Sequence, residues 1–193
     1  MHQFLTDFIL DVVQNSFEAE SNCVWLNLNE DDRYLKVEVK DDGKGMAAEV
    51  LRQVLDPYLT DGIKHTRRKV GLGLPFLAQA TRSAGGDFHI ESEQGKGTVV
   101  TCTFDLCNVD TPPFGDIPTT LSALISHPAA KDFHVIRSIA TVKGADRYQI
   151  SRRGLLDVLV SFSTVRDLKM LNQYLSSQED SLKPLYVDHP IIL

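Results

Sequence analysis

The sequence contains little cysteine, and its cysteines are not arranged in pairs. Cys23, Cys102 and Cys107 are the only three in 193 residues, and none belongs to a CxxC motif. An odd number of isolated cysteines argues against a disulfide scaffold and against a zinc site, and it favours a reducing compartment. We therefore expect a cytoplasmic protein.

Long hydrophobic runs are also missing. No uninterrupted apolar stretch approaches the roughly 20 residues that a membrane-spanning helix needs. The N-terminal segment carries Asp7 and Asp11 within its apolar stretch and has no basic leader or cleavage signal, so it does not resemble a signal peptide. The sequence predicts no association with a membrane.

No excess of basic charge marks the chain. The 26 acidic residues outnumber the 20 basic ones, which gives a net charge of −6 when the histidines are neutral. Because nucleic-acid-binding domains usually present a basic surface, this balance predicts no nucleic-acid partner. An apolar fraction of 42% and a charged fraction of 24% are ordinary for a globular protein of one large or two small domains.

Hydrophobic periodicity predicts alternating groups of helices and strands in the first half of the chain. The expected elements are a helix at 3–20, strands at 24–29 and 34–40, a short helix after 46, a helix at 70–86, and strands at 87–92 and 98–106. Two helices between two pairs of strands indicate an α+β sandwich, in which a mixed sheet carries its helices on one face.

A stretch rich in proline and glycine at 111–118 indicates a linker. We expect it to separate a first unit at 1–108 from a small C-terminal α+β extension at 109–193. No chemical motif occurs in the extension. Its expected elements are a helix at 119–126, strands around 133–142 and 146–151, and a closing helix at 164–177.

The first candidate motif follows the second predicted strand and has the sequence DDGKG at 41–45. Glycines allow a backbone to approach a flat ligand, and the Asp41 carboxylate can accept a hydrogen bond from an amine such as that of adenine. An ordinary Asp-Gly turn would have the same sequence, so this motif alone leaves both interpretations open.

A second glycine motif, VGLGL at 70–74, opens a predicted helix. Backbone amides exposed at such a helix start form an anion site, for which phosphate is the natural ligand. A helix start whose glycines serve only packing is the alternative, and neither the P-loop nor the dinucleotide-binding fingerprint fits. A third segment, GKGT at 95–98, precedes a strand and means little alone.

Asp11 and Asn15 are four residues apart in the first predicted helix, so they share a helix face. Their side-chain oxygens suit Mg²⁺ and its waters, and a carboxylate can also orient an attacking nucleophile. A polar stripe on an amphipathic helix is more often simply a solvated face.

Taken together and in this order, these segments resemble the GHKL ATPase superfamily, which includes the ATPase domains of gyrase, heat-shock chaperones, histidine kinases and MutL. The similar segments are 11–19 (DVVQNSFEA) for the N box, 41–45 for the G1 box, 71–74 for the G2 box and 95–98 for the G3 region. The resemblance covers residues 3–106 and implies a Bergerat-type fold for the first unit.

The resemblance further implies a site for ATP or ADP with Mg²⁺. Asp11 would be the catalytic residue, Asn15 would ligate Mg²⁺, and Asp41 would bind the adenine amino group. The other residues that it places at the nucleotide are Gly43 and Gly45 beside the base, Gly71 and Gly73 at the phosphates, Thr98 at the adenine end, and Arg67, Arg68 and Lys69 in an ATP lid at 58–69.

Two positions depart from the family's pattern. Members that hydrolyse or transfer phosphate usually have Glu where this chain has Asp11, and Glu18 replaces a residue that is usually basic in histidine kinases. The segments 70–81 and 91–104 nevertheless look most like the histidine kinase branch. Three functions stay open: slow ATP hydrolysis or phosphoryl transfer to a protein partner, an ATP-dependent conformational switch, and a degenerate module that binds no nucleotide.

No dimerisation helix with a phosphoacceptor histidine precedes the N box in this sequence. We therefore expect a stand-alone ATPase-domain protein and not a complete sensor kinase. The acceptor of any phosphoryl transfer would then belong to another protein.

Overall fold

A six-stranded sheet forms the centre of the protein, and the computed structural model describes residues 3–55 and 73–187 of it. The strands are β1 (Cys23–Asp31), β2 (Tyr34–Asp41), β3 (Phe88–Glu93), β4 (Gly97–Asp105), β5 (Asp132–Thr141) and β6 (Gly144–Ser151). Their order in the sheet is β3-β4-β2-β1-β5-β6. Every neighbouring pair is antiparallel except β1 and β5, which are parallel. The sheet is therefore mixed, as predicted.

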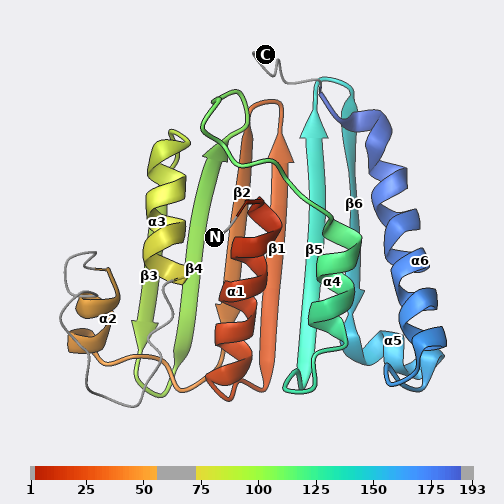
Figure 1. Cartoon of the computed structure of the whole chain (residues 1–193), viewed down its shortest axis with the longest axis horizontal. Helices are drawn as coiled ribbons and strands as arrows, with labels where there is room; N and C mark the ends of the chain where they lie inside the picture. The colour runs from red at the N-terminus through yellow and green to blue at the C-terminus, as the bar shows by residue number, and fades with distance from the viewer. Residues whose placement is uncertain (1–2, 56–72, 188–193) are drawn as a thin grey trace.

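The helices gather on one face of this sheet. They are α1 (Leu5–Glu18), α2 (Ala48–Leu55), α3 (Gly73–Ser83), α4 (Ile117–Ile125), α5 (Arg152–Leu159) and α6 (Val165–Leu182). Figure 1 shows α1, α3, α4 and α6 side by side in front of the strands. The predicted α+β sandwich, with a mixed sheet and helices on one face, is confirmed.

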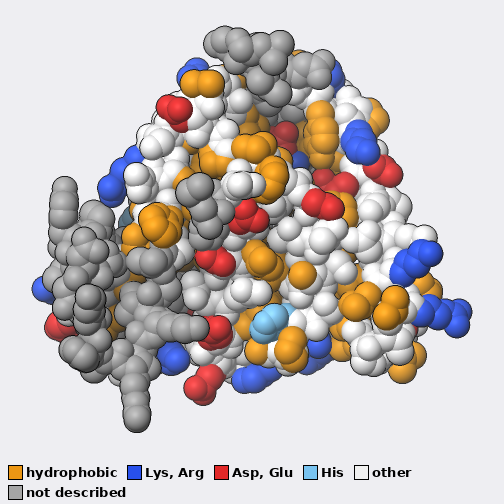
Figure 2. Space-filling view, viewed as in Figure 1, with side chains coloured by type: hydrophobic (Ala, Val, Ile, Leu, Met, Phe, Trp, Pro, Cys, Tyr) orange, Lys and Arg blue, Asp and Glu red, His pale blue; other side chains and the backbone are white. Residues whose placement is uncertain are grey.

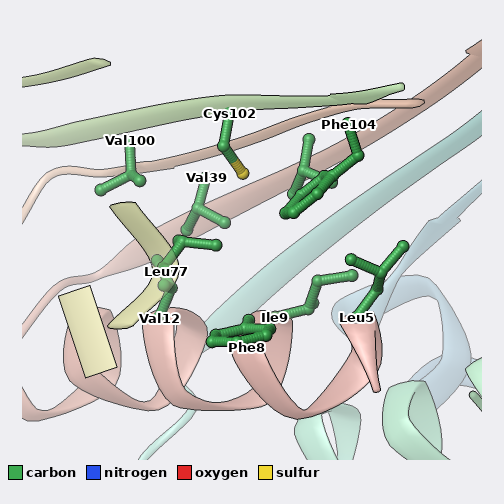
Figure 3. Close-up of a pocket in the computed structure, with 10 residues that line it drawn as sticks. Leu5, Phe8, Ile9, Val12, Val39, Leu77, Val100, Cys102 and Phe104 are labelled. Atoms are coloured by element: carbon green, nitrogen blue, oxygen red, sulfur yellow. The ribbon is translucent and has the colours of Figure 1, made fainter. Parts of the chain in front are cut away.

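The core lies between this helical layer and the sheet. Apolar residues at helical spacing in α1, including Leu5, Phe8 and Val12, are buried against alternate strand residues such as Val100 and Phe104. Figure 3 shows these side chains around an apolar pocket whose lining comes from α1, α3, β2 and β4. Because successive side chains of a strand alternate in direction, only one face of the sheet contributes to this core.

Residues 111–118, expected to be a linker, pack against the start of α1. The carbonyl oxygens of Pro113 and Phe114 accept hydrogen bonds from the backbone N–H groups of Leu5 (2.9 Å) and Thr6 (3.1 Å). These two donors belong to the first turn of α1, where no intrahelical acceptor exists for them. The sheet is continuous across the predicted boundary, since β5 lies directly beside β1. A division of the chain at residue 108 stays a prediction.

The sequence analysis overlooked α5. The side chain of Ser151 caps this helix by accepting a hydrogen bond from the Gly154 N–H at 3.1 Å. None of its eight residues is buried, and a glycine in the first turn lowers its helix propensity. A short helix with so little apolar periodicity gives a weak signal in the sequence.

The closing helix α6 begins after Thr164, as the periodicity predicts, and continues to Leu182, five residues past its predicted end. Thr164 accepts a hydrogen bond from the Asp167 N–H at 3.1 Å, while the Asp167 side chain binds the Thr164 N–H in return. This reciprocal capping box fixes the helix start. In the described ranges, 3–55 and 73–187, no helix has the length and apolarity needed to cross a membrane.

A buried ionic network joins α6 to β1, β5 and β6. The fully buried Arg137 of β5 is hydrogen-bonded to Glu30 of β1, and its Nε lies 3.8 Å from Oε1 of Glu179. Tyr148 and Tyr186 donate to Glu179 at 2.5 and 2.9 Å. Burial alone would lower the pKa of Arg137, but the Glu30 and Glu179 carboxylates outweigh it and raise that pKa above its usual value. The arginine therefore stays charged.

We expect replacement of Arg137 to destabilise the protein strongly. Arg137→Leu leaves Glu30 and Glu179 without their cation, and breaking a buried pair in this way costs about 3–5 kcal/mol of unfolding free energy. Arg147→Leu is the control, because Arg147 is an exposed arginine on β6 and should change stability by no more than about 0.5 kcal/mol. Urea unfolding of both variants measures the difference, and equal midpoints would contradict the assigned role.

Candidate functional site

Most of the site residues predicted within the described ranges meet at one end of the strands, on the face of the sheet that the helices cover. The end of β2, the start of β4, the C-terminal half of α1 and the start of α3 come together there (Figure 1). Register places Asp41 of β2 directly opposite Thr98 of β4. Both side chains point toward the helices, since Val39 and Val100, two residues away on the same strands, belong to the core.

The Asp41 carboxylate is buried, with 4% of the residue exposed, and is held by three neutral donors. Its Oδ1 accepts hydrogen bonds from the backbone N–H groups of Gly43 (2.9 Å) and Thr98 (3.3 Å). Its Oδ2 accepts one from the Ser16 hydroxyl of α1 at 2.8 Å. An ionised carboxylate offers about four lone-pair positions. The described contacts use three of them, so Oδ2 retains the capacity to accept one further hydrogen bond.

Two glycines let the turn after β2 pack against the β3–β4 turn. Gly45 has φ +60°, and a β-carbon there would lie 2.0 Å from the carbonyl oxygen of Glu93. Gly97 has φ +103°, and its β-carbon would lie 2.0 Å from the carbonyl oxygen of Asp41. Both positions therefore require glycine for backbone conformation and for close approach. Gly43 likewise borders α1, where a β-carbon would lie 2.7 Å from the Ala19 oxygen.

A serine of β3 links this turn to Thr98. The Ser92 hydroxyl accepts a hydrogen bond from the Met46 N–H at 2.9 Å and lies 2.9 Å from the Thr98 hydroxyl. It also lies 3.1 Å from the Gly97 carbonyl oxygen, which can accept its proton. The Thr98 side chain is thus oriented by the same turns that enclose Asp41.

Asp11 and Asn15 occupy successive turns of α1, and the start of α3 approaches the first of them. A β-carbon on Gly73 would lie 3.0 Å from Oδ2 of Asp11. Asn15 is exposed, and the next residue along the helix is Ser16, the donor to Asp41. The helix therefore carries a carboxylate, an amide and a hydroxyl along one border of the site.

Asp42 has a different role from its neighbour. Its Oδ1 accepts hydrogen bonds from the N–H groups of Asn22 (2.7 Å) and Cys23 (2.9 Å), which tie the end of β2 to the start of β1. Of two adjacent carboxylates, only Asp41 faces the helices. The alternation of side chains along an extended chain produces this division.

Five parts of the predicted site lie outside the described residues. They are Gly71, Arg67, Arg68, Lys69 and the remainder of the predicted lid at 58–69.

Two residues of the site were missed by the sequence analysis. Ser16 lies on the apolar face of α1 beside Val12, Val13 and Phe17, and it is buried. A hydroxyl at a core position of an amphipathic helix must find a buried hydrogen-bond partner. That requirement could have identified Ser16 from the sequence. Ser92 had no such signal, because its partners come from two other segments.

A comparison with protein families covers the part of the chain that carries these residues. Residues 2–108 match the sequence profile of the family described as histidine kinase-, DNA gyrase B- and HSP90-like ATPase. The match includes every predicted site residue and ends just before the segment expected to be a linker.

Individual relatives each match about half of the chain. Sporulation kinase C of Bacillus subtilis (strain 168) is 32% identical over 97 residues, 49% of this chain and 22% of that protein. Sensor histidine kinase ZraS of Escherichia coli (strain K12) is 30% identical over 99 residues, 50% of this chain and 20% of that protein. The matched segment thus spans only about a fifth of the length of these relatives. Among solved structures, the N-terminal domain of a DNA repair protein aligns with 86% of this chain and 59% of its own, with a TM-score of 0.46 and 14% identity.

Loss of the Ser16 hydroxyl should destabilise the protein through Asp41. Ser16→Ala removes a donor from a buried carboxylate, and a hydrogen bond to a charged group contributes about 1.5–3 kcal/mol to stability. Ser126→Ala is the matched control, because that hydroxyl binds the neutral Ser122 carbonyl and its loss should cost only about 0.5–1.5 kcal/mol. Urea unfolding compares the two, and a larger loss in the control would refute the importance of the Ser16 contact.

Proposed function

This chain belongs to the family of histidine kinase-, DNA gyrase B- and HSP90-like ATPases. From that premise we propose that it binds Mg-ATP, and ADP as product. The proposed site is the end of the sheet where Asp41 lies. The observation that carries the proposal is the state of the Asp41 carboxylate. It is buried, fixed by three donors, and able to accept one more hydrogen bond at Oδ2.

Adenine is the base that suits this acceptor. Its exocyclic amine donates a hydrogen bond to a carboxylate, whereas guanine presents a carbonyl oxygen at the corresponding position and would be repelled. The fixed donors around Asp41 prevent the carboxylate from turning away, so it is pre-organised for an amine. Thr98, opposite Asp41 and oriented by Ser92, would contact the same edge of the base.

Buried apolar side chains of the core begin directly beside this acceptor. Val39 and Val100 form the next pair along β2 and β4 toward the core, and both line the pocket of Figure 3. Val12 of α1 and Leu77 of α3 line the same pocket from the helical side. These side chains are already buried, so an aromatic ring would meet the margin of this apolar core while its amine reached Asp41.

The phosphates would lie toward α1 and the start of α3. Among its described residues, α3 has no acidic side chain of its own in its first turn, and the positive end of its dipole would attract the phosphates beside Asp11 of α1. Asn15 would supply an oxygen ligand to Mg²⁺, and Gly73 would bring the α3 backbone close to the phosphates. Gly71, Arg67, Arg68 and Lys69 are proposed to assist from residues outside the described ranges.

Asp11 would act as the general base, in slow ATP hydrolysis or in phosphoryl transfer to a protein partner. Its contact with Gly73 places a carboxylate beside the helix start that would hold the phosphates. The shorter reach of aspartate compared with glutamate favours the alternative function, an ATP-dependent conformational switch in which Asp11 does not catalyse. We propose a cytoplasmic protein without a nucleic-acid or membrane partner.

ATP should bind more tightly than GTP, and Asp41→Asn should weaken ATP binding. Asparagine keeps an acceptor for Gly43 and Thr98 but presents an amide NH₂ to the adenine amine, so affinity should fall by about ten- to a hundredfold. Asp42→Asn is the matched control, because within the described ranges the Asp42 carboxylate accepts its hydrogen bonds from backbone N–H groups at the start of β1. Calorimetric titration with Mg-ATP and Mg-GTP measures both effects. Equal affinities for the two nucleotides would refute the proposed site.

Turnover of ATP by Asp11 variants separates the two functions. If Asp11 is a general base, Asp11→Asn should lower kcat by roughly a hundredfold or more while ATP binding persists. Asp11→Glu should restore or raise kcat, because glutamate is the usual residue at this position of the family. Glu18→Gln, on the exposed end of the same helix, is the control. Unchanged ADP release by Asp11→Asn would exclude catalysis by Asp11, whereas the switch predicts no ADP release even by the unmodified protein.

A further inference from the structure

Three side chains with different ligand atoms meet on the face of the sheet that carries no core. Cys23 begins β1, and Asp132 and His134 are the first and third residues of β5. Register places Cys23 beside Asp132 and Trp25 beside His134. The intervening residues Val24 and Phe133 are fully buried on the helical side, so the three polar side chains share the opposite face.

The ligand atoms are close enough to share one ion. One atom from each side chain, a sulfur, a carboxylate oxygen and an imidazole nitrogen, lies within 4.8 Å of the other two. His134 Nε2 is 3.3 Å from Asp132 Oδ2, and these side chains are only 28% and 17% exposed. Asp132 Oδ1 accepts a hydrogen bond from the Phe133 N–H at 2.9 Å, which leaves Oδ2 directed at the histidine.

The neighbours hold this cluster in place. The indole ring of Trp25 stacks on the His134 imidazole, with ring centroids 6.2 Å apart and an interplanar angle of 12°. The Cys23 N–H donates a hydrogen bond to the Asp42 carboxylate, which fixes the backbone at Cys23. Asp132 and His134 are neighbours on one face of β5, and Cys23 lies on the paired strand β1. Because the sheet already holds these side chains together, they would lose little conformational freedom on binding an ion.

Other roles for Cys23 fit less well. It forms no disulfide; Cys102, also free, is buried on the helical side of the sheet. The carboxylate oxygens around the thiol instead create a negative environment that attracts cations.

We propose that Cys23, Asp132 and His134 bind a divalent transition-metal ion, with zinc as the expected ion. Sulfur, nitrogen and oxygen donors together suit zinc, whereas magnesium and calcium select oxygen alone. With bonds of about 2.0–2.3 Å, the ligand atoms of a tetrahedral site lie roughly 3.5 Å apart, so small side-chain rotations complete it. Water would take the fourth position. The site is independent of the proposed nucleotide site.

The sequence analysis argued against a zinc site, and this proposal departs from that expectation. Its ligands come from two strands separated by more than a hundred residues, and no CxxC pair occurs. The bound ion would connect β1 to β5, and thereby the family-matched part of the chain to the part that follows it.

Cobalt substitution tests the proposal directly. The full chain is freed of metal with a chelator, kept reduced, and titrated with Co²⁺ and no nucleotide. We expect a sulfur-to-cobalt charge-transfer band that saturates at one equivalent and is bleached by Zn²⁺. Cys23→Ser should abolish the band, and His134→Gln should weaken cobalt binding by roughly a hundredfold or more. Zinc should raise the melting temperature of the unmodified protein but not of Cys23→Ser.

The chain offers matched controls for both ligands. Cys107→Ser removes an exposed cysteine, and His89→Gln removes the exposed histidine that lies 3.0 Å from Glu91 on β3. Neither should change the cobalt spectrum. Absence of the band in the unmodified protein, its persistence in Cys23→Ser, or its loss in Cys107→Ser would overturn the proposal. If Cys23→Ser does not fold, unchanged cobalt affinity in folded His134→Gln overturns it equally.

Discussion

The parallel pairing of β1 with β5 is the constraint on which the rest of the molecule depends. It joins Cys23–Asp31 to residues 132–140 over the full length of β1, while the other edge of β1 pairs with β2. The β1–β5 register puts Cys23 beside Asp132 and brings Glu30 to Arg137, while the β1–β2 register sets Val24 opposite Asp41. A slip of one residue between β1 and β5 would exchange the two faces of a strand and separate the first two pairs. The buried ion pair and the metal-ligand cluster therefore share one structural cause.

Two buried charges in this sheet are satisfied in opposite ways, and the difference indicates which one serves binding. Arg137 is surrounded by carboxylates and by the ring of Phe114, whose centroid lies 5.2 Å away. Its charge is neutralised within the fold, so its contribution is structural. Asp41 has no cation among its described partners and depends on neutral donors from Ser16, Gly43 and Thr98. A carboxylate held without a counter-ion keeps its capacity to accept a donor from a ligand.

Local patterns in the sequence predicted the helices and strands. The pairing of strands that are far apart in the sequence could not be predicted in this way. The apolar spacing of α1 and the alternation in β1 and β2 gave helix and strands within a few residues of their observed bounds. Nothing local could reveal that β5 joins β1, because that contact closes a loop of about a hundred residues. The burial of Arg137 depends on the same pairing. The Asp41 environment was predictable through the order of the glycine motifs, but the Ser16 contact needed the packing of α1 on the sheet.

Helix α1 connects the proposed nucleotide site to the C-terminal part of the chain. Its middle and C-terminal turns carry Asp11, Asn15 and Ser16, while its first turn donates hydrogen bonds to the carbonyls of Pro113 and Phe114. A helix is stiff along its axis because each turn is hydrogen-bonded to the next. Any displacement of α1 at the site must therefore move the segment that leads into α4, β5 and α6. Phe114 also packs against Arg137, so that segment is anchored in the buried ionic network as well. An effect of nucleotide on the C-terminal part would pass through these contacts and through Phe17 of α1, which packs against His127 and Phe133.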